Sequence, residues 1–376
     1  MTKKLLVMAG GTGGHVFPGL AVAKLLQQQG WQIHWLGTPK RMEADLVPQH
    51  GFDISFINVE GLRGNGVLRL LKAPFKLINA VIQARRVIKQ FKPDVVLGMG
   101  GFASGPGGIA AWLSKVPLIL HEQNAVAGMT NKVLAKFASK VMVAFESALP
   151  GTIKQVVGNP IRADILEMVK SDDGIDLSTR DLHLLVVGGS LGAKVLNDTL
   201  PLTLPLLKNT RGVVVKHQVG KGNSEAVRIA YGDQHSKIQV SDFIEDMADA
   251  YQWADLVICR AGALTVSELA ALGLPAIFVP LPYAVDDHQT KNAQVLVEIG
   301  AAYLVKQSQL TPDELARLID DTNQDIKLEN MAKSSRKLGI NIACQQVAAG
   351  CAELAGVSDT ELNTILNIKI EPRVVK

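Results

Sequence analysis

Short apolar runs alternate with stretches of helical periodicity along most of this chain. In the first half the runs are a few residues long and rich in leucine and β-branched residues, which is typical of buried strands. They cover residues 5–9, 32–37, 53–59, 93–98, 117–121 and 140–144. Apolar residues at helical spacing between them predict helices over residues 18–29 and 74–91. This strand–helix alternation favours a parallel sheet with helices on both faces.

The alternation pauses at a last short strand and turn over residues 156–160, and it restarts after a polar stretch at residues 171–181. The strands expected in the second half cover residues 184–187, 213–219, 238–240, 256–259 and 276–279. A helix is expected over residues 263–272, and Thr311 with the three residues after it fits the cap and first turn of another. At 376 residues the chain exceeds one typical core, so we expect an α/β protein of two Rossmann-like domains.

Each half opens with a glycine-rich turn directly after its first strand. Residues 10–15 are Gly-Gly-Thr-Gly-Gly-His, and residues 188–193 are Gly-Gly-Ser-Leu-Gly-Ala. Glycine lets the backbone approach phosphate oxygens closely, and the following helix aims N–H groups and its positive dipole end at them. Each turn alone is also compatible with an ordinary tight strand-to-helix connection. Their recurrence half a chain apart favours two sites, for a nucleotide diphosphate and for a second phosphorylated molecule.

Composition narrows the class of protein. Hydrophobic residues make up 47% and charged residues 20% of the chain, as in a folded globular protein, and aromatic residues at 5% disfavour a groove for single-stranded nucleic acid. The three cysteines form no CxxC pair, which fits a reducing cytoplasm. The apolar run at residues 5–9 is too short for a signal peptide, and no uncharged apolar stretch reaches the roughly 18 residues that cross a bilayer.

Residues 61–92 carry a local excess of positive charge in a chain whose net charge is only +4. Basic residues and no acidic ones occur there, namely Arg63, Arg69, Lys72, Lys76, Arg85, Arg86, Lys89 and Lys92. Apolar side chains are threaded among these cations, and that mixture favours a surface that lies on anionic lipid. The alternative is an amphipathic crossover helix with a solvated basic face. Nucleic acid is a third and weaker interpretation.

The chemistry of the glycine turns excludes two familiar classes. The dinucleotide fingerprint has Val16 where its third glycine belongs, and the four residues directly after the strand at residues 32–37 include no acidic one. Neither turn ends in the Lys-Ser/Thr of a P-loop. In the second half, Gly262 permits a turn before the helix that starts near Ala263. Glu268, expected in the first turn of that helix, would accept the hydroxyls of a ribose, or would only complement the helix dipole.

Five blocks of sequence, taken together and in order, resemble the MurG family of bacterial peptidoglycan glycosyltransferases. The blocks are residues 10–18, 121–125, 158–162, 188–190 and 260–268. The resemblance runs from Leu5 to about Leu354 and implies a GT-B fold, with two Rossmann-like domains facing a cleft. It implies an acceptor and membrane domain at residues 1–160, a UDP-GlcNAc domain at 161–340, a helix at 341–355 that returns to the first, and a tail of unknown structure at 356–376. Leu191 departs from the family's usual glutamine.

The resemblance implies inverting transfer of GlcNAc from UDP-GlcNAc to undecaprenyl-diphosphate-MurNAc-pentapeptide (lipid I). The product is lipid II, made by a peripheral protein at the cytoplasmic face of the inner membrane. The residues implied to bind UDP-GlcNAc are Thr12, Gly13, Gly14, Asn124, Arg162, Ser190, Ile244, Ala263, Leu264, Thr265, Val266, Ser267, Glu268 and Gln289. The acceptor's diphosphate is expected on Gly11, Gly100, Gly101 and Ser104.

Inversion by one displacement needs a base for the acceptor hydroxyl. His15 is the candidate because its pKa class suits that task near neutral pH, and Glu122 is the second candidate. His15 could equally hydrogen-bond a phosphate or cap the loop. The chain contains no D-x-D motif, so we expect no metal cofactor, and a helix N-terminus with Arg162 would stabilise the leaving UDP. A glycosyltransferase for another lipid, a UDP-GlcNAc 2-epimerase and a non-enzymatic sensor of UDP-sugars are the alternatives.

Overall fold

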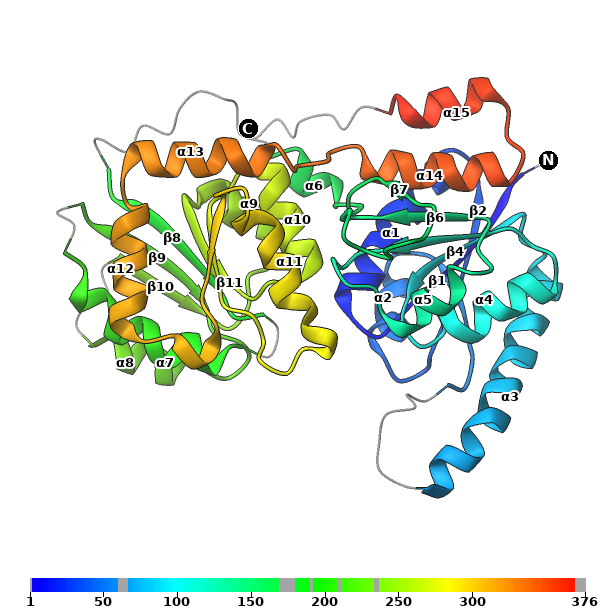
Figure 1. The fold of residues 1–376 in the computed structure, drawn as a ribbon, viewed down its shortest axis with the longest axis horizontal. Helices are drawn as coiled ribbons and strands as arrows, with labels where there is room; N and C mark the ends of the chain where they lie inside the picture. Colours follow the sequence, from blue (N-terminus) through cyan, green and yellow to red (C-terminus); the bar gives the residue numbers. More distant parts are fainter. Residues whose placement is uncertain are drawn as a thin grey trace. The chain divides into compact units, whose positions relative to one another are not determined.

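The computed structural model describes residues 2–59, 67–168, 180–189, 192–208, 211–232 and 237–368. These residues form two compact units (Figure 1). Unit 1 contains the described residues up to Arg162 and those from Asn341 onwards, and unit 2 contains those from Ala163 to Ile340. Each unit is built on its own parallel sheet, as two Rossmann-like domains require.

Unit 1 contains a seven-stranded sheet in the order β3-β2-β1-β4-β5-β6-β7, in which every neighbouring pair is parallel. Its strands are β1 (Lys4–Ala9), β2 (Gln32–Gly37), β3 (Asp53–Phe56), β4 (Val95–Gly100), β5 (Leu118–Glu122), β6 (Lys140–Val143) and β7 (Gln155–Val156). The central strands are apolar along almost their whole length because helices cover both faces. The order reverses at β1 and β4, so the turns after these two strands lie side by side.

The helices of unit 1 divide between the two faces of its sheet (Figure 1). They are α1 (Gly13–Gln28), α2 (Met42–Gln49), α3 (Val67–Phe91), α4 (Ser104–Leu113), α5 (Met129–Leu134), α14 (Ala343–Leu354) and α15 (Asp359–Leu366). Leu5 and Val7 of β1 join a core with α1 and α14, whereas Leu6 and Met8 join a second core with α3 and α4. The alternation of β1 side chains therefore sends consecutive residues into opposite cores.

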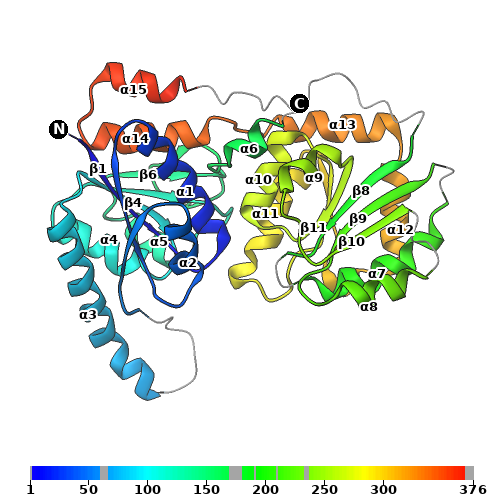
Figure 2. The same ribbon diagram turned by 180° about the vertical axis from the view of Figure 1, so that it is seen from behind.

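Unit 2 contains a six-stranded parallel sheet in the order β10-β9-β8-β11-β12-β13 (Figure 2). Its strands are β8 (Leu182–Val187), β9 (Val213–Gln218), β10 (Ile238–Ser241), β11 (Leu256–Cys259), β12 (Ala276–Phe278) and β13 (Ala302–Leu304). Its α-helices are α6 (Ala163–Leu166), α7 (Lys194–Thr203), α8 (Ser224–Tyr231), α9 (Met247–Trp253), α10 (Ala263–Leu272), α11 (His288–Val297), α12 (Pro312–Thr322) and α13 (Asp325–Arg336). The Thr311 cap is confirmed, since its hydroxyl accepts a hydrogen bond from the Glu314 N–H.

Most predicted strands are confirmed within a few residues, and α10 has the predicted bounds. Two differences bear on the site. The first helix begins at Gly13 rather than at Pro18, so His15 lies in its first turn and Pro18 lies inside it. In addition, the segment after Gly356, to which the sequence assigned no element, contains α15. A capping box between Ser358 and Glu361 begins that helix.

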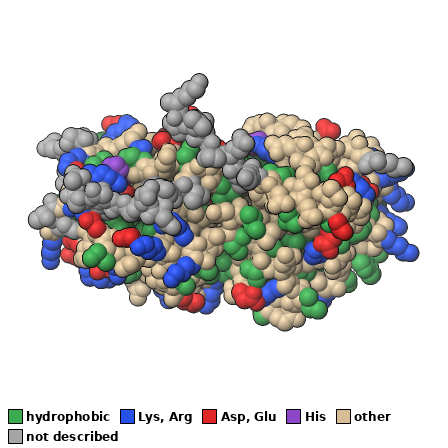
Figure 3. Space-filling model, turned by 90° about the horizontal axis from the view of Figure 1, so that it is seen from above, with side chains coloured by type: hydrophobic (Ala, Val, Ile, Leu, Met, Phe, Trp, Pro, Cys, Tyr) green, Lys and Arg blue, Asp and Glu red, His purple; other side chains and the backbone are tan. Residues whose placement is uncertain are grey.

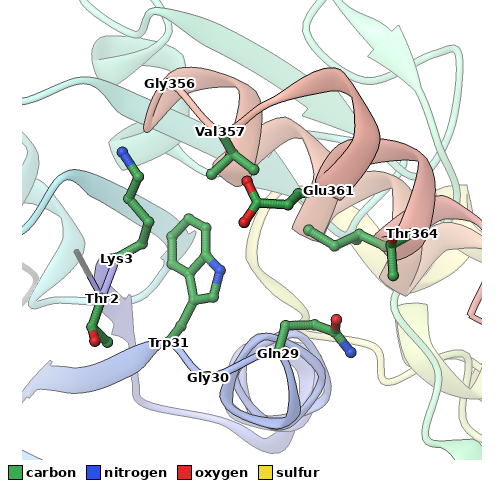
Figure 4. Close-up of a pocket in the computed structure, with 10 residues that line it drawn as sticks. Thr2, Lys3, Gln29, Gly30, Trp31, Gly356, Val357, Glu361 and Thr364 are labelled. Atoms are coloured by element: carbon green, nitrogen blue, oxygen red, sulfur yellow. The ribbon is translucent and has the colours of Figure 1, made fainter.

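Helix α15 encloses a pocket of about 330 Å³ against the edge of unit 1 (Figure 4). Trp31 and Lys3 line one side of it, and Val357 and Glu361 line the other. None of the glycine-turn residues lines this pocket. Within the described ranges, no helix combines the length and the apolar character that crossing a bilayer requires.

Candidate functional site

The first glycine turn connects the end of β1 to α1. Gly11 has a φ of +92°, which favours glycine, and Thr12 is the extended N-cap residue whose carbonyl accepts from the Val16 N–H. Gly13 and Gly14 form the start of α1, where the first N–H groups of a helix have no intrahelical acceptor. The Gly11 N–H is donated to the Glu43 carboxylate at 2.9 Å. This N–H of Gly11, a residue that the sequence assigned to the acceptor's diphosphate, is therefore engaged by a carboxylate in the described structure.

The His15 imidazole is oriented by the same turn. Its Nδ1 lies 3.2 Å from the Gly10 carbonyl oxygen and 3.4 Å from the Thr12 hydroxyl. A carbonyl oxygen can only accept, so this geometry assigns the proton of the neutral ring to Nδ1. Nε2 is then the basic nitrogen, on the side of the ring that faces Gly100. A Cβ added to Gly100 would lie 3.0 Å from Nε2.

A second turn, after β4, packs directly against the first one. Gly101 has a φ of +90°, and a Cβ there would come within 2.2 Å of the Gly10 oxygen. Only glycine allows this approach. Ser104 begins α4 and is fully buried, and its hydroxyl lies within hydrogen-bond distance of the Gly100 and Met8 carbonyl oxygens. The Ser104 hydroxyl therefore holds the turn, and a phosphate at this place would meet the backbone N–H groups at the start of α4.

Glu122, the second candidate base, is buried at the end of β5 and its two oxygens are both engaged. One oxygen accepts from the backbone and side-chain N–H groups of Asn124, at 2.9 and 3.2 Å. The other accepts from Asn131 at 2.9 Å and from the Gly128 N–H at 3.3 Å. Glu122 thus orders the loop that carries Asn124. Its neighbour His121 is also buried, and burial lowers the pKa of that imidazole to about 4.

Arg162 is the last residue of the first segment of unit 1. Its guanidinium lies over the Phe17 ring of α1, with 6.0 Å between its Cζ and the ring centroid. It also contributes, after burial and Lys24, to lowering the pKa of His50. Arg162, the residue that the sequence predicted to bind the diphosphate, is therefore a cation held beside the first helix of unit 1.

The second glycine turn, after β8, is held by a buried amide. The Gln218 side chain accepts from the Gly189 N–H at 3.1 Å and donates to the Gly189 oxygen at 3.0 Å. Gly192 has a φ of +74°, and a Cβ there would meet the Val219 oxygen at 2.2 Å. Ser190 and Leu191 lie outside the described residues. The described part of this turn leads into α7, as the sequence predicted.

Helix α10 begins as expected but places Glu268 differently. Gly262 is its N-cap residue, so residues 263–266 form the first turn. Glu268 lies in the second turn, and its expected place in the first turn was wrong. Dipole complementation at the first turn therefore does not account for Glu268. Its carboxylate instead accepts a hydrogen bond of 3.1 Å from the hydroxyl of Tyr251, a buried residue of α9.

Two further residues of unit 2 that the sequence assigned to UDP-GlcNAc, Ile244 and Gln289, follow the carboxyl ends of strands, one on a loop and one at the start of a helix. Ile244 is half-buried in the segment between β10 and α9. Gln289 is in the first turn of α11, and its side-chain oxygen accepts from the Leu281 N–H at 2.9 Å. The carboxyl edge of a parallel sheet is where open α/β folds bind ligands.

The sequence did not reveal the side chains that hold the predicted site residues in place by hydrogen bonds. Glu43 binds the first glycine turn, Gln218 binds the second, and Tyr251 binds Glu268. Gln218 ends a strand that begins with three valines, but Lys216 and His217 precede it directly, so its polarity gave no distinct signal. Glu43 lies on a helix that the periodicity did not reveal, and Tyr251 is far in sequence from its partner.

Comparison with known proteins covers most of the chain. Residues 5–143 match the glycosyltransferase family 28 N-terminal domain, and residues 183–347 match the C-terminal domain of the same family. The UDP-N-acetylglucosamine--N-acetylmuramyl-(pentapeptide) pyrophosphoryl-undecaprenol N-acetylglucosamine transferase of Shewanella sediminis is 57% identical over 361 residues, covering 94% of this chain and 98% of that protein. The protein of that name from Aeromonas hydrophila is 57% identical over 357 residues, again covering 94% and 98%.

Solved structures give the same assignment of the fold. The crystal structure of Acinetobacter baumannii MurG matches with a TM-score of 0.80 and 46% identity, covering 93% of this chain and 99% of that one. The calicheamicin glycosyltransferase CalG4 matches with a TM-score of 0.68 at 14% identity, covering 95% and 99%. A UDP-N-acetylglucosamine 2-epimerase matches with a TM-score of 0.61 at 14% identity, covering 95% and 97%. The last two likenesses show the fold alone.

Proposed function

We propose that this chain, which belongs to the MurG family within glycosyltransferase family 28, transfers N-acetylglucosamine from UDP-N-acetylglucosamine to lipid I. The product is lipid II, in which a new β-1,4 bond joins GlcNAc to the lipid-linked muramyl pentapeptide. A 2-epimerase shares the fold at 14% identity, whereas relatives named for this transfer are 57% identical over nearly their whole length. Sequence, rather than fold, therefore favours the transferase over the epimerase.

The His15 geometry carries the proposal on the chemical side. Inversion at the anomeric carbon by one displacement needs a group that takes the proton of the acceptor's 4-hydroxyl as that oxygen attacks. An imidazole whose Nδ1 donates to the Gly10 carbonyl presents a basic Nε2, as in hydrolases where a fixed Nδ1 hydrogen bond selects the working tautomer. Glu122 supports the base less well, because both of its oxygens hold the Asn124 loop.

We assign UDP-GlcNAc binding mainly to residues of unit 2. Glu268, held by Tyr251, accepts the ribose hydroxyls, and the first turn of α10 donates N–H groups to phosphate. Ile244 pairs with the uracil edge, Gln289 binds the sugar, and Ser190 lies by the diphosphate. From unit 1 we assign Thr12, Gly13, Gly14 and Asn124 to the sugar and phosphate, and Arg162 to the diphosphate.

Departure of UDP leaves negative charge that must be stabilised. The chain has no D-x-D motif, so we assign this task to the α10 N-terminus and to Arg162, and no metal cofactor is part of the proposal. Activity after exhaustive treatment with EDTA tests this point. A complete loss that Mg²⁺ or Mn²⁺ restores would show that a metal shares the task.

The acceptor's diphosphate is assigned to the turn after β4 rather than to Gly11. The Gly11 N–H is donated to Glu43, and a buried carboxylate behind a phosphate would repel it. Within the described residues, no carboxylate forms a hydrogen bond with Gly100, Gly101 or Ser104, and these residues lead into the first turn of α4. This assignment leaves His15 Nε2 next to Gly100, close to the bound acceptor.

Helix α3 supports docking of unit 1 on a membrane. The interval 60–66 is outside the described residues, as are the side chains of residues 67–73, so Arg63, Arg69 and Lys72 are not tested. On the rest of α3, Ala80, Ala84 and Ile88 face the core, whereas Phe75 is 75% and Ile78 57% exposed. An ordinary crossover helix would bury its large apolar residues.

The exposed face of α3 combines apolar and basic side chains. Phe75, Ile78 and Ile82 are spaced by three and four residues, and Arg85, Arg86 and Lys89 continue the same face. The end of α3 that carries Phe75 projects beyond the other elements of unit 1 in Figures 1 and 2. On the face drawn in Figure 3, by contrast, basic and acidic side chains are interspersed. Such a helix would insert its apolar part while its cations meet anionic headgroups.

A second exposed apolar group lies on α4, which packs against α3, and on α5, which packs against α4. Trp112 at the end of α4 is 53% exposed, and its ring lies 5.3 Å from that of Phe137, just after α5. Met129 and Val133 of α5 are exposed as well. Together with α3 they make a broad membrane-facing surface for a peripheral protein at the cytoplasmic face of the inner membrane, where the lipid acceptor lies.

One assay tests the function as a whole. The purified chain is given radiolabelled UDP-GlcNAc and a short-chain analogue of lipid I, and label is followed into the organic phase. Transfer of label to the lipid, with release of UDP, is the expected result. Label that stays in a water-soluble sugar of changed configuration would identify an epimerase, and unreacted donor would leave only a sensor of UDP-sugars.

A further inference from the structure

Glu43 is a buried carboxylate for which the reaction described above gives no role. It lies in the first turn of α2 and is fully buried. One oxygen accepts from the backbone N–H and hydroxyl of Thr38, at 3.0 and 2.7 Å. The other accepts from the Gly11 N–H at 2.9 Å. A carboxylate this deep is costly unless it is hydrogen-bonded, and these three donors satisfy it.

The contact with Gly11 reaches His15 through one peptide group. The Gly11 N–H and the Gly10 carbonyl belong to the same planar amide. At one end this amide donates to Glu43, and at the other end its oxygen accepts from His15 Nδ1, 3.2 Å away. A carboxylate on the N–H polarises the amide and makes its oxygen a stronger acceptor. Carboxylate, peptide and imidazole therefore form one hydrogen-bonded chain.

The peptide in this chain is fixed from both sides. A Cβ at Gly10 would come within 2.4 Å of a Glu43 oxygen, and a Cβ at Gly101 would come within 2.2 Å of the Gly10 oxygen. The Gly10–Gly11 amide thus has little freedom to turn over. If this amide flipped, its oxygen would no longer be available as the acceptor for His15 Nδ1.

We propose that Glu43 is a positioning residue that, through the Gly10–Gly11 peptide, keeps His15 protonated on Nδ1 with Nε2 as its basic atom. The proposal rests on the proposed function in taking His15 as the base. It assigns to Glu43 the task that a directly bound carboxylate performs in other imidazole bases, with one peptide inserted between the two.

Other charged groups near α1 are held differently. Glu122 is bound by Asn124, Gly128 and Asn131, and Arg162 lies over Phe17. His50, which follows α2, has a pKa lowered by burial, Lys24 and Arg162. His34 of β2 is bound to Ser55, and burial lowers the pKa of His34.

On α14, Cys344 and Cys351 are buried thiols whose pKa is raised by burial, and Glu353 pairs with Lys140. None of these contacts involves the Gly10–Gly11 peptide.

The test compares Glu43→Gln with Thr38→Val. The glutamine keeps the size of the side chain but removes its charge, whereas the valine removes one donor to Glu43 and leaves the contact with Gly11 in place. The tautomer of His15 is measured by nitrogen-15 NMR on histidine-labelled protein, with His15→Ala used to assign the signal. The parent and Thr38→Val should hold neutral His15 protonated on Nδ1, and Glu43→Gln should populate both tautomers.

Kinetics give a second readout. Glu43→Gln should lower kcat about tenfold, since only part of a general base's contribution is lost, with KM for UDP-GlcNAc changed less than twofold. The acid limb of its pH profile should move to lower pH, because a negative charge that favours the imidazolium is gone. Glu43→Asp, which keeps the charge, should restore most of the turnover. Thr38→Val should show the parent's profile.

The proposal is overturned if Glu43→Gln keeps the parent's tautomer and acid limb, and loses activity only as far as its stability falls. Glu43 would then be a structural residue of the turn. Failure of the proposed function looks different. If His15→Ala keeps its turnover, His15 is not the base, whereas the tautomer measured by NMR still reports whether Glu43 orients the ring.

Discussion

The two glycine turns share one design but differ in the side chain that holds each from behind. Both follow a central buried strand, contain glycines at positive φ and lead into a helix. In unit 1 the supporting group is the Glu43 carboxylate, and in unit 2 it is the Gln218 amide. A carboxylate next to a phosphate site is unfavourable, whereas an amide carries no net charge. The difference suggests that the second turn is the better place for the donor's diphosphate, whereas the first turn, which also carries Thr12, Gly13 and Gly14, has the additional task of orienting a base.

The same contrast extends to the residues beyond the turns. His15 in unit 1 is fixed through a backbone carbonyl, while Glu268 in unit 2 is fixed by a tyrosine hydroxyl. Base chemistry needs one tautomer, and ribose recognition needs one carboxylate orientation. With His15 as the proposed base and Glu268 as the proposed ribose ligand, substitutions in the two units should change different kinetic constants.

The largest effect is expected for His15→Ala. It should lower turnover by roughly 10²–10⁴-fold, the usual contribution of a general base, with little change in KM for UDP-GlcNAc. The measurement is steady-state transfer to a soluble lipid I analogue over a range of pH, where the variant should also lose the acid limb. His50→Ala, another half-buried histidine of unit 1, is the control and should behave like the parent. Normal turnover with weak acceptor binding would make His15 a phosphate ligand.

A smaller effect, common to both units, is expected from acid. Burial lowers the pKa of His121 in unit 1 and of His217 in unit 2 to about 4. The unfolded chain takes up these protons near pH 6.5 but the folded chain does not. The free energy of unfolding should therefore fall as the pH drops from 6.5 to 4, by about 3 kcal/mol for each histidine, and this contribution should be constant above pH 6.5.

Urea denaturation at several pH values measures this loss. Carboxylates titrate in the same range, so the comparison is between the parent and His217→Gln, which should lose about half of the histidine contribution. A variant with the parent's dependence on pH would show that His217 is not held neutral. His121→Gln makes the same comparison for unit 1.

Periodicity predicted the fold well because each unit is a parallel sheet of buried apolar strands. Among the elements it missed are α2, β13, with three residues, and α15, whose signal was the capping box between Ser358 and Glu361. It also placed the start of α1 at Pro18, because proline is common at the first helical position, whereas the N-cap is Thr12. Short elements and unexpected caps carry too little pattern to be recognised.

Some residues of the candidate site could also be predicted from the sequence, and others could not. Glycine turns, His15 and the segment around Glu268 are readable because their chemistry is local in sequence. The partners Glu43 and Tyr251 are not, since their roles arise only when the fold brings α2 to the first turn and α9 to α10. Ser104 looked like a phosphate ligand, and its burial against two carbonyls depends on tertiary packing.

Membrane docking sharpens the comparison of the units, since only unit 1 should carry it. Arg85→Gln with Arg86→Gln should weaken sedimentation with vesicles of anionic lipid by roughly 30-fold at low salt, because each cation near the surface contributes about 1 kcal/mol. The matched control, Lys221→Gln with Lys306→Gln, removes the same charge from exposed positions of unit 2. Equal losses in the two pairs would mean that net charge, and not α3, drives the association. Transfer to a soluble acceptor should be unchanged in both.

The smallest effect is expected for Tyr251→Phe, which tests the donor side of the comparison. The tyrosine hydroxyl donates to Glu268 at 3.1 Å, and without it the carboxylate loses its orientation toward the ribose. We expect KM for UDP-GlcNAc to rise about fivefold, near 1 kcal/mol for one hydrogen bond, with kcat nearly unchanged. Tyr231→Phe is the control, since it removes a buried hydroxyl of the same unit that contacts His217 instead.

The sharper measurement compares UDP-GlcNAc with its 2′-deoxyribose analogue. The parent should favour the ribose and Tyr251→Phe should favour it less, because the interaction that reads the 2′-hydroxyl runs through Glu268. If the variant discriminates as strongly as the parent, other residues bind the ribose. The contact between Tyr251 and Glu268 would then have no part in binding the donor.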